Sequence, residues 1–190
     1  MYDHNLEYVM KSKLVLFLLL VFLTTVGADC VNDPIVVALA VDPIKGCYPV
    51  NTGNGSFSGT TTVTLKDLIP SDFRDKLKGI RVYDVSVKVE GPYPSGNVSG
   101  NGYVRFDSGP ELHVLSFSGQ YSAFANGVSL LNSGGLITPA SGFRQFLSQI
   151  SDLNNLPTQA TLRGQGSGPA ATQSFSVCII ISLQADATAN

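Results

Sequence analysis

The segment that most restricts the fold is Ser174–Ala185, because its apolar residues recur at every second position. These residues share one parity and are Phe175, Val177, Ile179, Ile181 and Leu183. Side chains alternate between the two faces of a β-strand, so this pattern predicts a strand with one wholly apolar face. A face of this kind needs cover along its full length. We therefore expect this strand at the centre of a sheet.

Six further segments have the composition of strands and are separated by short links rich in turn residues. They are Ile35–Val41, Thr60–Leu65, Ile80–Glu90, Val98–Phe106, Leu112–Phe124 and Thr158–Arg163. In Ile80–Glu90 the apolar parity changes between Val82 and Val85, which predicts a β-bulge near Tyr83-Asp84. Consecutive strands with short links favour antiparallel pairing.

Two segments have helical patterns. The first is short and runs through residues 68–79, with Pro70 suited to a first turn and Gly79 suited to its end. The second covers residues 138–156 and carries one apolar stripe, with Thr138-Pro139 expected at its start. The stripe consists of Phe143, Phe146, Leu147, Ile150 and Leu153.

This order of elements lacks the βαβ alternation of parallel sheets. It predicts a mostly β protein, built as an antiparallel β-sandwich or curved sheet with one short and one longer amphipathic helix. The alternative is an α+β fold with both helices on one face of the sheet. Residues 29–190 are expected to form a single β-rich extracellular domain.

The N-terminal segment has the layout of a signal peptide. Ten uninterrupted apolar residues, Leu14–Leu23, follow Lys11 and Lys13 and precede small residues that end at Ala28. Ten residues are too few to span a bilayer, which takes about 20. We expect residues 1–28 to be a signal peptide and the protein to be secreted or bound at the cell surface or envelope.

Three cysteines, Cys30, Cys47 and Cys178, follow the expected cleavage point. Export favours disulfides, and a Cys30–Cys47 bridge would leave Cys178 as a buried thiol. In the alternative, Cys30 is lipidated and anchors the protein to a membrane, and Cys47 and Cys178 pair instead. The spacing lacks a C-x-x-C motif, so no metal site is expected.

The charge balance excludes nucleic acid as a partner. Removing residues 1–28 takes away two basic and two acidic residues and leaves ten Lys and Arg against twelve Asp and Glu. A nucleic-acid-binding domain would carry a basic stripe or a strongly positive charge. The glycine-rich segments 51–55 and 164–168 lack the lysine and helix of a phosphate-binding loop. We interpret both as flexible connections and expect no cofactor.

Few residues are candidates for a site. His113 is the one histidine after residue 28, so a hydrolytic triad is not expected. Asp84 lies beside the expected bulge in an apolar strand, and Tyr93 and Tyr103 are candidate contact residues. Two N-x-S sequons, at Asn54 and Asn97, are candidate glycosylation sites.

The sequence thus favours a non-catalytic module with a binding or structural, assembly role. Its partner is an unidentified protein or surface component, with loops 91–101 and 164–173 as the expected contacts. The alternative is a carrier of a hydrophobic small molecule, which Phe143 and Phe146 would cover from the helix in 138–156. An exported hydrolase has the least support.

Overall fold

The computed structural model describes residues 36–92, 95–170 and 174–188. The expected signal peptide, Cys30 and Tyr93 lie outside these residues. The strands are β1 (Val36–Ala40), β2 (Ile44–Pro49), β3 (Ser56–Thr64), β4 (Leu77–Glu90), β5 (Asn97–Phe106), β6 (Glu111–Gln120), β7 (Val128–Ser129), β8 (Ile137–Pro139), β9 (Gln159–Ser167) and β10 (Ser176–Thr188). The helical elements are α2 (Phe143–Ser151) and the 3-10 turns η1 (Leu65–Leu68), η2 (Ser71–Lys76), η3 (Tyr121–Phe124), η4 (Leu130–Asn132) and η5 (Leu153–Asn155).

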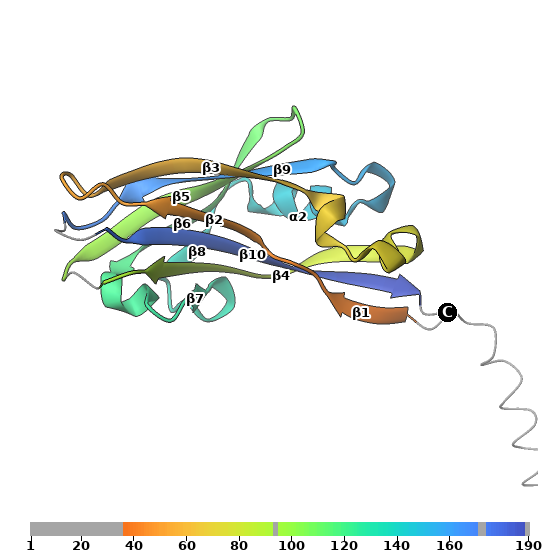
Figure 1. The fold of residues 1–190 in the computed structure, drawn as a ribbon, viewed down its shortest axis with the longest axis horizontal. Helices are drawn as coiled ribbons and strands as arrows, with labels where there is room; N and C mark the ends of the chain where they lie inside the picture. Colours follow the sequence, from red (N-terminus) through yellow and green to blue (C-terminus); the bar gives the residue numbers. More distant parts are fainter. Residues whose placement is uncertain (1–35, 93–94, 171–173, 189–190) are drawn as a thin grey trace, which may run out of the picture. The chain divides into compact units, whose positions relative to one another are not determined.

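The ten strands form two five-stranded sheets in which the pairings are antiparallel. Sheet A has the order β1-β10-β4-β7, and β2 also pairs with β10. Sheet B has the order β3-β9-β5-β6-β8. Figure 1 shows the two sheets as separate layers, with β2 running between β3 and β10. The prediction of a mostly β, antiparallel sandwich is confirmed.

The centre of sheet A follows the sequence pattern closely. β10 pairs with β1 and β2 on one side and with β4 on the other, and the apolar residues of its predicted parity are buried. Along β4, Ser182 of β10 pairs with Asp84 and Leu183 pairs with Val82. Tyr83 is therefore the extra residue of a β-bulge, where the parity change predicted one.

Helix α2 packs as part of the core. Phe146 and Ile150 are fully buried, and the Phe146 ring stacks on Phe106 of β5 with ring centroids 5.9 Å apart. The helix contacts β4 of sheet A and β6 of sheet B, so it lies against both layers. The alternative fold, with both helices on one face of a single sheet, is wrong, because the apolar stripe of α2 is covered from both sheets.

Three local predictions differ from the structure. Thr138-Pro139 does not begin the helix, because Ile137–Pro139 pairs with β6 and Ile137 is buried, so α2 begins at Phe143. The short helix is two 3-10 turns, η1 and η2, and Gly79 lies within β4. The sequence did not reveal β2, whose buried positions are Ile44, Gly46 and Tyr48, because a glycine stands at the middle one in place of a strong strand former.

The disulfide links Cys47 to Cys178, so the predicted Cys30–Cys47 bridge is wrong. These residues are directly opposite in the β2–β10 pairing, with Cα atoms 4.0 Å apart. The predicted pairing depended on the position of β2, which the sequence pattern did not show. The bond joins positions separated by 131 residues and ties the edge strand β2 to the central strand β10.

Glycines in the strands make room for large side chains between the sheets. Tyr48 is 2 % exposed, and its hydroxyl donates to the carbonyl oxygen of Leu162 at 3.0 Å. Its ring lies against Gly59 of β3 and Gly164 of β9. Burial raises the pKa of Tyr48 to about 12. Gly164 and Gly166 thus lie within β9, and the interpretation of 164–168 as a flexible connection is wrong for its first four residues.

Replacing Gly164 by alanine is expected to lower the free energy of unfolding by about 2–3 kcal/mol, measured by urea denaturation. The added Cβ would lie 2.2 Å from Cε2 of the Tyr48 ring. This ring is buried, so it has little room to move away. Gly79→Ala is the matched control, because its Cβ would meet its nearest neighbour, Asp186 Oδ2, at 3.5 Å. Equal effects for these two strand glycines would contradict the packing argument.

Candidate functional site

The outward side of sheet B carries a continuous set of polar side chains, which we call the polar face. Strand pairing aligns it in four rows, each crossing β6, β5, β9 and β3. The rows are Ser118–Ser99–Ser167–Ser56, Ser116–Asn101–Gln165–Ser58, His113–Tyr103–Arg163–Thr60 and Glu111–Arg105–Thr161–Thr62. None of these residues is buried. The face combines hydroxyl, amide and aromatic groups with three formal charges.

The alternation of the strands produces this face. In β5, Tyr103 and Arg105 point away from buried Val104 and Phe106. In β6 the parity changes, because Tyr103 pairs with His113 while Gly102 pairs with Leu115. Val114 is the extra residue and is 1 % exposed, so it lies on the buried side, whereas Ser116 and Ser118 lie on the polar face.

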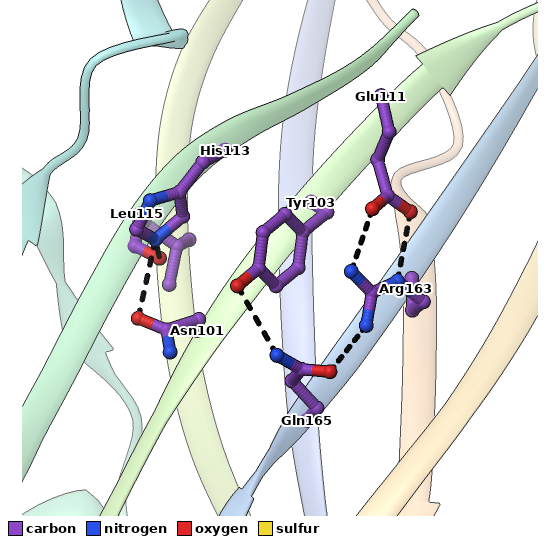
Figure 2. Close-up of polar contacts among 7 residues, drawn as sticks. All are labelled: Asn101, Tyr103, Glu111, His113, Leu115, Arg163 and Gln165. Carbon is purple, nitrogen blue, oxygen red and sulfur yellow. Dashed lines mark hydrogen bonds and ion pairs between the residues drawn. The ribbon is translucent and has the colours of Figure 1, made fainter.

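A stack of three side chains forms the centre of the polar face (Figure 2). The Tyr103 and His113 rings are stacked with centroids 4.8 Å apart, and the Arg163 guanidinium lies 4.1 Å from the Tyr103 ring centroid. Gln165 donates to the Tyr103 hydroxyl at 3.2 Å and accepts from Arg163 Nη1. Aromatic stacking and the cation–π contact thus link side chains from three neighbouring strands, β6, β5 and β9.

Arg163 also forms a two-point ion pair with Glu111. Its Nε donates to Glu111 Oε1 at 2.7 Å and its Nη2 to Oε2 at 2.6 Å. The hydrogen bonds from Arg163 lower the pKa of Glu111, and those to Glu111 raise the pKa of Arg163. This planar, two-point geometry orients the guanidinium so that it remains over Tyr103.

His113 is held by polar contacts on the opposite side of the stack. Its Nε2 lies 3.1 Å from Asn101 Oδ1 and 3.1 Å from the carbonyl oxygen of Leu115. Both neighbours accept hydrogen bonds, so Nε2 carries the proton. Ser116 donates to Asn101 Oδ1 at 2.8 Å. The Ser116 hydroxyl also lies 3.2 Å from His113 Nε2, and these three contacts together orient the ring.

The structure distributes the predicted site residues widely. Tyr103 lies in the polar face, whereas Phe143 and Phe146 belong to the helix and its core contacts. Asp84 accepts a hydrogen bond from Ser129 at 2.6 Å, which ties β4 to β7. Asn54 and Asn97 are exposed.

Sequence reasoning missed Arg163 and Gln165, the two residues that connect the stack to β9. The alternation of Arg163 and Gln165 with Gly164 and Gly166 was the available signal, but the glycines suggested a loop. Of the predicted contact loops 91–101 and 164–173, residues 97–101 and 164–167 lie in β5 and β9.

Replacing Glu111 by glutamine is expected to remove a pH-dependent part of the stability. Because the folded-state pKa of Glu111 is lowered, its contribution is present above the unfolded value of about 4.3 and is lost as the pH falls through the folded value. Its side chain is 39 % exposed, so solvent screening limits the effect to below about 1 kcal/mol. Urea denaturation of both proteins between pH 7 and 3 measures the difference. A constant difference over this range would contradict the ion pair.

By architecture, then, the described part of the chain is an antiparallel β-sandwich with one polar outer face. No protein-family model and no curated protein matches the sequence. Within the described residues, no helix is both long enough and apolar enough to cross a membrane.

The chain resembles several solved virus structures at low identity. A turnip yellow mosaic virus chain is 9 % identical with a TM-score of 0.36, covering 83 % of this chain and 96 % of that one. The decameric BFDV capsid protein is 11 % identical with a TM-score of 0.37, covering 80 % and 99 %. A mud crab tombus-like virus chain is 9 % identical with a TM-score of 0.37, covering 83 % and 91 %. Similarity at this level says nothing about the function of this chain.

Proposed function

We propose that this chain is a secreted or surface-associated, non-catalytic β-sandwich module that binds a protein partner through the polar face. One observation carries the proposal: sixteen polar side chains are aligned in four rows on an uncovered side of sheet B. Strand pairing fixes their spacing, and the stack at the centre fixes the orientation of the largest of them.

The composition of the polar face suits protein recognition. Tyrosine and arginine supply much of the binding energy in protein interfaces, while short serine and asparagine side chains adapt their hydrogen bonds at low entropic cost. Neighbouring side chains already hold Tyr103 and Arg163 in place. Binding a partner therefore costs little additional side-chain entropy at these two residues. Lysine and aspartate, which are depleted in interfaces, do not occur among the sixteen residues, whereas serine and glutamate, which are also depleted there, do.

The two other functions have less support from the described residues. A hydrophobic carrier would use Phe143 and Phe146 to cover a ligand, but Phe146 is engaged with Phe106 in the core. An exported hydrolase would use His113 and Asp84, which are held by Asn101 and Ser129 respectively. Export rests on residues 1–28, and anchoring through a lipid on Cys30 is the alternative form of the same proposal.

Site-specific photo-crosslinking in the producing cells tests the proposed face. A photoreactive amino acid replaces Thr60, exposed on β3 in the polar face, or Lys45, exposed on β2 of sheet A, as the control. We expect Thr60 to yield one crosslinked protein, identified by mass spectrometry as a partner or a second copy, and Lys45 to yield none. Ser99→Arg, which places a large charged side chain in the face, should abolish that product while the thermal midpoint stays within a few degrees.

Two results would count against the proposal. One is crosslinking of equal yield from both positions, which would indicate non-specific proximity. The other is a chain that sediments as a monomer and gives no crosslink from Thr60. The location is tested separately, because N-terminal sequencing of the exported product distinguishes a start at Asp29 from a lipidated start at Cys30.

A further inference from the structure

The outward side of sheet A brings together three side chains that are far apart in the sequence. Cys47 of β2 and Cys178 of β10 are paired directly, and Glu90 of β4 pairs with Ser176, two residues from Cys178. The two sulfur atoms and a carboxylate oxygen of Glu90 all lie within 4.8 Å of one another. Two thiolates and a carboxylate are ligands of thiophilic divalent cations.

We propose that reduction of the Cys47–Cys178 bond creates a site for a cation of the Zn²⁺ type, held by Cys47, Cys178 and Glu90. A small thiol such as dithiothreitol or glutathione supplies the two electrons. Two thiol groups of the reductant reduce the protein disulfide. Cys47 and Cys178 become free thiols, and the reductant becomes a disulfide. Binding of the cation then releases two protons as both cysteines become thiolates.

The spacing of the three ligands suits one ion. Ligand atoms around tetrahedral Zn²⁺ lie about 3.5–3.8 Å apart, given Zn–S distances of about 2.3 Å and Zn–O distances of about 2.0–2.2 Å. The two sulfur atoms are bonded to each other in the disulfide, so after reduction they must move apart to reach this spacing, while Glu90 already has a carboxylate oxygen within 4.8 Å of both. The backbone positions are held by the opposite side of the sheet, where Val177, Ile179 and Val89 are fully buried. A fourth position remains for water.

Two lysines lie beside the three proposed ligands. Glu90 accepts a hydrogen bond from Lys45 at 3.2 Å and lies 3.5 Å from Lys88. By strand pairing, Lys45 lies opposite Ile180 and Lys88 lies opposite Cys178. The two charged lysines, the two thiolates, Glu90 and a divalent cation together carry a net charge of about +1.

The sequence argued against a metal site because the three cysteines lack a C-x-x-C spacing. In the structure the ligands are brought together by strand pairing and not by closeness in sequence. β2 and β4 both pair with β10, which places residues 47, 90 and 178 side by side. The site is conditional on redox state, because both sulfur atoms are consumed by the disulfide in an oxidising compartment. Under reducing conditions the cation would replace the covalent link between β2 and β10.

Cadmium titration of the full chain tests the site, with Cys30→Ser as the background so that two thiols remain. The protein is reduced anaerobically with dithiothreitol, transferred to metal-free buffer and titrated while thiolate-to-cadmium absorption is recorded in the ultraviolet. We expect one equivalent to bind the reduced protein and none to bind the oxidised protein. Zn²⁺ should raise the thermal midpoint of the reduced protein only.

Glu90→Gln is expected to weaken cadmium binding by at least about tenfold. Glu111→Gln is the matched control, because it makes the same change on sheet B and should alter the affinity less than twofold. Equal affinities in these two variants would overturn the assignment of Glu90. Absence of the absorption band, or a reduced chain that is unfolded with and without Zn²⁺, would overturn the whole site. None of these outcomes bears on binding by the polar face.

Discussion

Replacing both Cys47 and Cys178 by alanine is expected to lower the free energy of unfolding by about 3–5 kcal/mol. The bond closes a loop of 131 residues, so its loss returns a large amount of conformational freedom to the unfolded chain. The chain-entropy relation gives about 5 kcal/mol for a loop of this length, and measured losses fall at or below such values. Denaturation in guanidinium chloride measures the change.

Dithiothreitol provides the control for this effect. The reductant should destabilise the parent protein by a similar amount and leave the double alanine variant unchanged. If the reductant lowered the stability of both proteins equally, a different bond would be responsible. A double variant as stable as the parent would show that β2 is held without the disulfide, by Tyr48 and the strand pairing alone.

Phe146→Ala is expected to cost about 3–5 kcal/mol, because it opens a cavity where the side chain is now fully buried. The ring loses its stacking on Phe106 and its contact with Phe143, whose centroid is 6.1 Å away. Phe143→Ala is the control on the same helix and should cost less than half as much, since Phe143 is only half-buried. Thermal and urea denaturation measure both.

This comparison also separates core packing from a carrier function. If α2 covered a ligand cavity, Phe146 would line that cavity and its loss would cost little. A loss below about 1 kcal/mol, together with lipid that co-purifies with the parent protein, would therefore favour the carrier. If the core is filled, the Phe146→Ala variant gains a dry cavity, and a small aromatic such as benzene should raise its thermal midpoint.

The sequence pattern predicted those elements whose burial can be read from consecutive residues. Alternation in residues 174–185 and in 80–90 identified β10 and β4, and the parity change identified the bulge at Tyr83. The helix stripe was recognised, but its start was placed too early because the pairing of Ile137 with Phe117 is a contact between distant residues. β2 was missed because its burial depends on Tyr48 entering a space left by glycines of β3 and β9.

The candidate site depends on register, which lies outside any local pattern. Tyr103 was predicted as a contact residue, but its neighbours His113 and Arg163 come from two other strands. A shift of one residue in either pairing would move all side chains of that strand to the opposite face. The same holds for Cys47 and Cys178, whose pairing follows from β2 lying beside β10.

The sequence by itself determined that this chain builds antiparallel strands around an apolar β10 with one amphipathic helix, because period and parity reflect burial at each position. Only the tertiary structure decided that the space left by glycines of β3 and β9 holds Tyr48, that the disulfide joins Cys47 to Cys178, and that sixteen polar residues align in rows. The physical reason is that strand partners and register are chosen by packing between segments distant in the sequence.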